Sequence, residues 1–419
     1  MLKKIILLTF FLLPTAALSA KEYSFLELQQ LAINENPRLK SMKYQTDMLK
    51  HRVAVSKSLD DPKLKIAINN LPINNFSLRE EEMTSKEISL SQMIPLGGKL
   101  DIKERSAIKD YYKALEIYKR EKIELLHQLR SAVYELFYLD EIIKINEEQK
   151  RYFDILIESQ SLAVKAGKGS LSNVLKANME KNMIDEEIIT IKQKRVEMIS
   201  KIKYLAGIKD ITDIKTVNLE DIDILPPDTG KIKHDVLEKN VEIRLLKLER
   251  DISSDEKKLR EKMLYPDLEI GISYMQRDSS PMGMKRADMI TLMAGINIPI
   301  WYRSKNLNDI EEMRKKEIMI DSLVEDKKNE LISRTESISA EILKLYQLNR
   351  LYVENLLPQT ELAIETDLSA FKTQDKEMMA VIDTIRQYLR FKKEIFSMKK
   401  EYLILNSEIK MMLTEEVIE

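Results

Sequence analysis

The chain has 419 residues, and its 68 basic and 69 acidic residues leave a formal net charge of -1. This balance gives no reason to expect nucleic acid as a partner. Cysteine is absent, which excludes disulfides, thiolate metal ligands and a lipid-modified N-terminal cysteine. With 33% charged residues, 6% aromatic residues and only 9 glycines, the composition favours long helices with charged surfaces over a compact β-sandwich.

Residues 1–20 have the pattern of a secretory signal peptide. Lys3 and Lys4 precede an apolar run from Ile5 to Leu13, and small residues follow as far as Ser19. This apolar run is shorter than the roughly 20 residues that a membrane-spanning helix needs, and charges interrupt the later apolar runs. We therefore expect an exported protein that is soluble in the periplasm, secreted, or a β-barrel.

The rest of the chain repeats itself. Pro62 and Pro95 are followed, 204 positions later, by Pro266 and Pro299 in the same local pattern. Two pairs of prolines, each separated by the same 204 positions, indicate a duplication. We expect a first repeat, a linker and a second repeat at residues 21–206, 207–230 and 231–419.

Both repeats predict the same order of elements. A helix of about 30 residues leads into two strands, then a helix of about 66 residues, a short break and a helix of about 35 residues. Between Ala114 and Ile143 the apolar residues of the longest helix are separated by threes, fours and a seven, which is coiled-coil spacing. Such a helix rises roughly 100 Å. We expect a long rod in which the two shorter helices stack beside the long one.

The predicted strands alternate apolar and polar side chains. They cover residues 63–70, 85–95, 267–276 and 287–299. A solvated sheet packed on helices would show the same alternation. Strand lengths of about 9–12 residues, aromatic residues near the strand ends and polar segments between the strands instead favour an outer-membrane barrel. Because the smallest barrels of this kind have about 8 strands, closure requires several copies of the chain.

Known catalytic and cofactor motifs were not found. Gly97, Gly98 and Lys99 lack the earlier glycine and the following Ser or Thr of a nucleotide-binding loop. We expect the two glycines to turn the chain from a strand into a helix, because glycine adopts positive φ readily. The three histidines, His51, His127 and His234, lie apart without metal-ligand spacing. We expect neither enzyme activity nor a cofactor.

Methionines are concentrated around the second strand pair. They are Met275, Met282, Met284, Met289 and Met293. Thioethers are soft ligands that bind Cu(I), so passage of copper or silver ions through the protein is one interpretation. Flexible packing is the interpretation that the sequence favours.

The signal peptide, the duplicated plan, the stretch SLSQMIPLGGKLDIKE (89–104) and the break AGKGSLSNVL (166–175) together resemble the TolC family of outer-membrane efflux proteins. The segment QMIPLGGKL is similar to the heavy-metal, CzcC-like branch of that family. The resemblance implies a mainly α fold with membrane β-structure. Three chains would contribute four strands each to a 12-stranded barrel, continued into the periplasm by an α-helical coiled-coil tunnel.

The resemblance also implies a location and partners. The location is the bacterial outer membrane, with the tunnel extending into the periplasm. The partners are outer-membrane lipid, two further copies of the chain, a periplasmic adaptor (membrane fusion) protein, and an inner-membrane pump that is either a resistance-nodulation-division pump or an ABC exporter.

Three groups of site residues follow. The resemblance places the tunnel entrance at Asp383, Asn173, Phe371, Lys376 and Arg386. It places the adaptor-contacting tip at Gly167, Lys168, Gly169, Ser170, Gln374 and Asp375. The joint between barrel and tunnel is expected at Pro95, Gly97, Gly98, Pro299 and Trp301. Asp383 is expected either to form a ring of three acids in a trimer or to pair with Lys376 or Arg386.

The sequence is compatible with three functions. The first is a passive outer-membrane duct of a tripartite efflux system, which conducts metal ions or small toxic molecules. The second is the duct of a type I protein secretion system, and the third is a periplasmic coiled-coil protein that is no channel. The sequence leaves open whether a metal, a drug or a peptide is exported.

Overall fold

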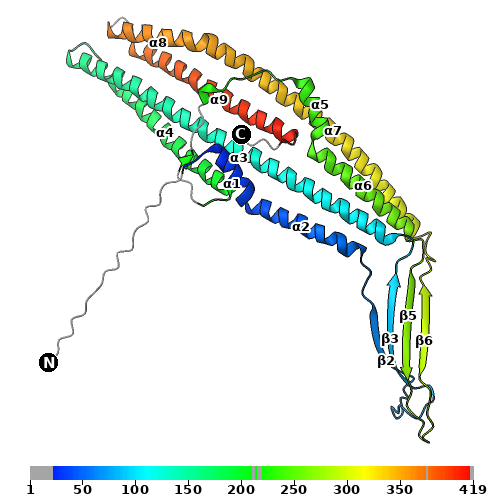
Figure 1. Cartoon of the computed structure of the whole chain (residues 1–419). Helices are drawn as coiled ribbons and strands as arrows, with labels where there is room; N and C mark the ends of the chain where they lie inside the picture. The colour runs from blue at the N-terminus through cyan, green and yellow to red at the C-terminus, as the bar shows by residue number, and fades with distance from the viewer. Residues whose placement is uncertain (1–21, 210–212, 215–218, 374–375, 416–419) are drawn as a thin grey trace, which may run out of the picture.

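The structure is a computed structural model that describes residues 22–209, 213–214, 219–373 and 376–415. It is a rod of long helices with a small sheet at one end (Figure 1). The predicted signal peptide, residues 1–20, lies outside the described residues, as do Gln374 and Asp375 of the predicted tip.

The first half contains two strands between helices. Its elements are β1 (Glu22–Tyr23), α1 (Phe25–Glu35), α2 (Pro37–Lys57), β2 (Lys63–Asn69), β3 (Ser85–Ile94), α3 (Lys99–Lys165) and α4 (Leu171–Ala206). Helix α3 runs without interruption because no glycine or proline occurs between its ends.

The second half has a similar order. Its elements are β4 (Asp213–Ile214), the short 3-10 helix η1 (Leu219–Asp221), α5 (Thr229–Lys239), α6 (Val241–Lys262), β5 (Leu268–Gln276), β6 (Met289–Ile296), α7 (Asn306–Leu351), the π-helical turn η2 (Tyr352–Leu356), α8 (Leu357–Lys372) and α9 (Met378–Met412). Strand β4 pairs in parallel with β1, which places this part of the segment 207–230 beside the start of α1.

The helices differ from the expected pattern at three points. The first helix of each half is divided in two, at Asn36 and at Asn240. Each asparagine accepts hydrogen bonds from the first N–H groups of the next helix, which ends one helix and starts another. The long helix of the second half is divided by η2, which lies just before Pro358. Proline has no N–H to donate to the preceding turn, and the helix widens there.

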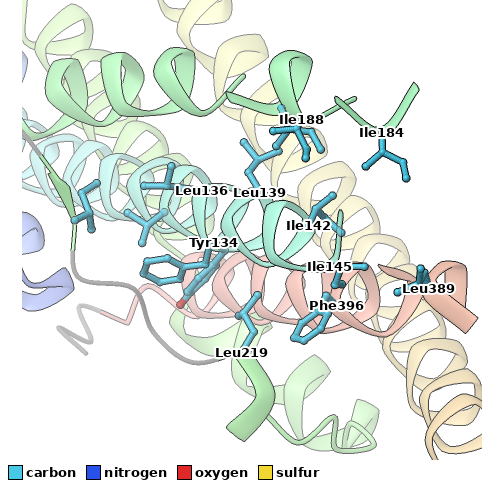
Figure 2. Close-up of a cluster of buried hydrophobic side chains, with 14 of the residues drawn as sticks. Tyr134, Leu136, Leu139, Ile142, Ile145, Ile184, Ile188, Leu219, Leu389 and Phe396 are labelled. Carbon is cyan, nitrogen blue, oxygen red and sulfur yellow. The ribbon is translucent and has the colours of Figure 1, made fainter. Parts of the chain in front are cut away.

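The largest cluster of buried hydrophobic side chains in the described residues lies along α3. The predicted apolar row of α3 is buried at Ala114, Leu125, Leu129, Ala132, Leu136 and Leu139. The last five belong to this cluster, and Tyr118 and Ile143 pack against it partly buried. Figure 2 shows Leu139 and Ile142 of α3 with Ile188 of α4 and Phe396 of α9 in this cluster. Burial of this row fixes α4 and α9 against α3.

The sheet is antiparallel throughout, in the order β2-β3-β5-β6. Directly opposite residues share a face, so the register decides which side chains lie together. One row consists of Leu64, Leu90, Ile272 and Leu292, and on the other face lies a row of Lys65, Ser89, Ser273 and Thr291. The sheet therefore has one apolar and one mainly polar face. Among the described residues, none of the helices combines the length and apolar character needed to cross a membrane.

Candidate functional site

Two regions contain the residues singled out in the sequence, and they lie at opposite ends of the rod. The joint connects the sheet to the helices, and the tip is where α3 meets α4 and α8 approaches α9 (Figure 1).

The first connection of the joint is a tight turn between β3 and α3. Strand β3 ends at Ile94, just before Pro95, and Gly97 and Gly98 both have a φ of 75°. Residues with a Cβ rarely adopt this φ, so glycine makes the change of direction without strain. A Cβ on Gly97 would lie 3.5 Å from the Cβ of Tyr265, which shows how closely the two halves approach here.

Lys99 ties this turn to the other half of the chain. Its buried amino group donates to Asp267 Oδ1 at 2.6 Å and to the Tyr265 carbonyl at 2.8 Å. The backbone N–H of Leu96 donates to the same Asp267 oxygen at 3.2 Å. Lys99, which follows the two glycines, therefore binds the carboxylate of Asp267 in the same chain. Sequence reasoning missed this pair, whose only local signal is an acid directly after the anchor Pro266.

The second connection, between β6 and α7, is built differently. It contains Pro299 and Trp301, whose carbonyl accepts from the Lys305 N–H at 2.9 Å. The Trp301 side chain is 72% exposed, and Ile298 and Ile300 are exposed to a similar extent. This connection therefore exposes one aromatic and two apolar side chains where β6 is joined to α7.

At the tip, the turn between α3 and α4 depends on two glycines. Gly167 has a φ of 73°, and a Cβ on Gly169 would lie 2.7 Å from the Val164 nitrogen. The N–H groups of Lys168 and Gly169 both donate to the Ala163 carbonyl, at 2.9 and 3.0 Å. Lys168 and Ser170 are exposed at this end of the rod.

The structure brings several predicted entrance residues together. Asn173, Phe371 and Lys376 line one cleft between the ends of α3 and α4 and the ends of α8 and α9, and Lys168 lines it too. Phe371 is buried, with 8% of its surface exposed. It therefore packs against the helices of its own chain.

An acid that sequence reasoning missed lies beside this cleft. Asp367 of α8 is buried, forms an ion pair with Lys376, and accepts a hydrogen bond from Thr384 Oγ1 at 2.6 Å. Burial by itself raises the pKa of Asp367, but the hydrogen bonds from Lys376 and Thr384 outweigh it and lower that pKa below its ordinary value. This network connects α8 to α9.

Asp383 lies apart from that network. Its side chain is 69% exposed, and Arg386 is 3.3 Å away on the same helix. Arg386 also lies 2.5 Å from Glu180 of α4, and the hydrogen bond to Glu180 is the main cause of its raised pKa. Within one chain, Asp383 thus pairs with Arg386, whereas Lys376 pairs with Asp367. A ring of Asp383 in a trimer stays a prediction.

The histidines and the acids do not assemble a metal site in the part of the chain that the structure describes, where no group of three or more His, Asp or Glu is placed to hold an ion. His127 is partly buried with Nδ1 3.0 Å from Ser407 Oγ, and burial lowers its pKa. His234 is exposed beside Asp235, and His51 is exposed on α2.

The chain resembles known proteins in its structure but not in its sequence. Neither a protein-family model nor a curated protein sequence matches the chain. Solved structures do match. The outer membrane protein VceC from Vibrio cholerae has a TM-score of 0.78 and 11% identity, over 93% of this chain and 96% of that chain. The chain has the TolC fold.

Two outer membrane channels match to a similar extent. The MtrE outer membrane channel of Neisseria gonorrhoeae, solved in its open state, has a TM-score of 0.73 and 11% identity, over 93% of this chain and 89% of that chain. The CmeC outer membrane channel of Campylobacter jejuni has a TM-score of 0.73 and 11% identity, over 93% and 85%. The predicted fold class is confirmed as mainly α with one four-stranded sheet, and the trimer stays a prediction. Identity this low transfers no residue roles.

Proposed function

We propose that the chain is the outer-membrane channel component of a tripartite efflux system. Three copies form one barrel in the outer membrane and one tunnel in the periplasm, and the tunnel passively conducts its substrate to the exterior. The observation that carries the proposal is the sheet, which has an exposed apolar face and two edges that pair on one side only within the described residues.

The apolar face has the chemistry of a lipid contact. Leu64, Ile66, Ile290 and Leu292 are 65%, 76%, 68% and 79% exposed. Exposed apolar area costs about 25 cal/mol per Å² in water, and a continuous face of it marks a surface that something else covers. No helix of this rod packs on the sheet in Figure 1, so lipid is the cover that we propose.

The sheet edges explain why several copies are needed. Strands β2 and β6 lie at the two ends of the order β2-β3-β5-β6. In lipid, each unsatisfied backbone N–H or C=O group costs several kcal/mol, so an open sheet cannot enter the membrane alone. Pairing of β6 with β2 of the next copy closes a barrel of 12 strands when three copies of these four strands join.

The helices also expose a surface that fits a neighbouring copy. Leu171, Leu175, Met179 and Met183 of α4 recur every four residues and are 57% to 65% exposed. Residues four apart lie on one helix face. We propose that this face packs against another copy of the chain in the tunnel.

The tip is the proposed contact with the partners. The exposed turn with Lys168 and Ser170 meets the periplasmic adaptor, together with Gln374 and Asp375, and the adaptor connects to an inner-membrane pump of the resistance-nodulation-division or ABC type. We propose metal ions or small toxic molecules as the substrates. The resemblance to the heavy-metal branch supports the former.

The test is purification of the full chain from outer membranes and reconstitution into planar lipid bilayers. We expect an SDS-resistant trimer that dissociates on heating, and stepwise conductance from the reconstituted protein. A chain that a salt wash removes from the membrane, or that remains monomeric and without conductance in bilayers, would contradict the proposal.

A further inference from the structure

We propose that Met275 and Met289 form a binding site for a soft monovalent cation, Cu(I), on the polar face of the sheet. The inference goes beyond the proposed channel, because the two thioethers belong to one chain and their binding of an ion requires no conduction.

The methionines are concentrated in one hairpin. Five lie in the 19 residues from Met275 to Met293, whereas the average of 21 in 419 would place about one there. Strands β5 and β6 hold three of them, and the connecting loop holds Met282 and Met284. Local enrichment of one residue type in a hairpin points to a role for its thioether group.

The register places the two methionines directly opposite each other. Met275 and Met289 are directly opposite in the antiparallel pair of β5 and β6. The Cβ atoms of such partners lie about 4.5–5.5 Å apart. A methionine side chain has three rotatable bonds, so both sulfurs can turn toward one ion. Glu87 of β3 is opposite Met275 on the far side and extends the same row.

This pair lies outside the apolar face of the sheet. The two methionines lie on the face that also carries Ser273 and Thr291, while the apolar residues of β5 and β6 lie on the opposite face. Met289 is 46% exposed. Met293 differs, because its methyl group would be 3.2 Å from a Cβ on Gly271 and therefore covers that glycine. We accordingly leave Met293 out of the site.

The donor set selects the ion. Thioethers are soft and neutral, and they favour Cu(I) over Mg²⁺ or Ca²⁺, which prefer oxygen. The carboxylate of Glu87, which accepts a hydrogen bond from Asn69, can balance the charge of the ion. A thioether carries no proton at ordinary pH, so acid does not compete for it as it competes for histidine or cysteine ligands.

The test is a titration of the detergent-purified full chain with Cu(I), in competition with a chromogenic Cu(I) chelator, at pH 5 and pH 7. We expect one Cu(I) for each chain at both pH values. The double variant Met275→Leu, Met289→Leu keeps side-chain volume, and we expect its affinity to fall by about tenfold or more. The matched control is Met48→Leu, Met319→Leu, which removes two exposed methionines from α2 and α7 and should bind as the unaltered chain does.

X-ray absorption at the copper edge of the loaded, unaltered protein gives a readout that does not depend on a variant, and we expect sulfur neighbours. The inference is overturned if the unaltered chain binds no Cu(I), if the copper has no sulfur neighbours, or if both double variants lose affinity equally. A chain that binds Cu(I) through this pair but conducts no ions would contradict the proposed channel and leave the site standing.

Discussion

The amino group of Lys99, at the start of α3, lies 2.6 Å from the carboxylate of Asp267, just before β5. The two residues belong to different halves of the chain, and their pair fixes the position of the sheet relative to the rod. Removing one member of a buried pair leaves the other charge without compensation, which costs about 3–5 kcal/mol when burial is complete. Asp267 is 23% exposed, so we expect a smaller loss here.

We therefore expect Lys99→Met to lower the temperature at which the purified protein unfolds. The matched control is Lys103→Met, one turn further along α3, where the side chain is exposed and should tolerate the change. The double variant Lys99→Met, Asp267→Leu should recover part of the stability, since it removes both charges. A double variant less stable than Lys99→Met alone would show that the pair has no such coupling.

The two faces of the sheet should respond differently to an added charge. Leu292 is 79% exposed on the apolar face, and its neighbour Thr291 points to the polar face. A lysine on a lipid-facing strand position costs about 2–4 kcal/mol near the middle of the membrane. We expect Leu292→Lys to reduce the amount of trimer recovered from outer membranes.

Thr291→Lys is the control, placed one residue away. We expect it to assemble normally and to shift the ion selectivity of the reconstituted protein toward anions, because its charge would line the lumen. Equal recovery of the two variants would contradict the assignment of the faces.

The strands and the helix α3 could be predicted because their signals are local. Alternation along residues 85–95 and the apolar spacing from Ala114 to Ile143 depend only on neighbours a few residues apart. The same reasoning missed the breaks at Asn36 and Asn240. These two asparagines are separated by the repeat offset of 204, and each donates its side-chain N–H to the carbonyl of a residue near the end of its half.

The features that the sequence did not predict depend on contacts between segments far apart in the chain. The side chain of Asn36 reaches the Leu205 carbonyl, and Lys99 reaches Asp267, over sequence separations of 169 and 168 residues. A single sequence contains no periodicity that reports such a pair. The network of Asp367 was missed for a related reason, because burial of an acid depends on how α8 packs against α9.

The Asp367 network predicts a dependence of the tip on pH. Its pKa is lowered in the folded protein, so its contribution to stability is present above the ordinary value of 3.8 and is lost as the pH falls through the lowered pKa. We expect amide exchange at the end of α8 to accelerate in that acidic range while the core along α3 stays protected.

Asp367→Asn should remove this dependence and accelerate exchange at the end of α8 at neutral pH as well. Asp383→Asn is the matched control, since Asp383 is 69% exposed and pairs with Arg386 of the same helix. An Asp367→Asn chain with the same exchange profile as the unaltered chain would show that Lys376 and Thr384 do not fasten α8 to α9.

The exposed turn between α3 and α4 predicts a charge effect on partner binding. Lys168 is exposed at the end of the rod, and the backbone around it is fixed by Gly167 and Gly169. We expect Lys168→Glu to weaken capture of the adaptor in a pull-down, because reversal of a rim charge changes association without altering the fold. Lys194→Glu, at an exposed position within α4, should not change it. Undiminished capture by Lys168→Glu would count against the tip assignment.

Asp383 either forms a ring of three acids in a trimer or only pairs with Arg386, and conductance distinguishes the two. Its carboxylate is 3.3 Å from Arg386, which also contacts Glu180, so one base is shared between two acids. If three copies bring Asp383 together at the tunnel entrance, the ring attracts cations. We expect Asp383→Ala to raise the conductance in planar bilayers or to weaken block by multivalent cations. Asp326→Ala, which removes an acid that α7 exposes away from the tip, is the control and should conduct as the unaltered protein does. Unchanged conductance and block in Asp383→Ala would mean that the carboxylate only pairs with Arg386.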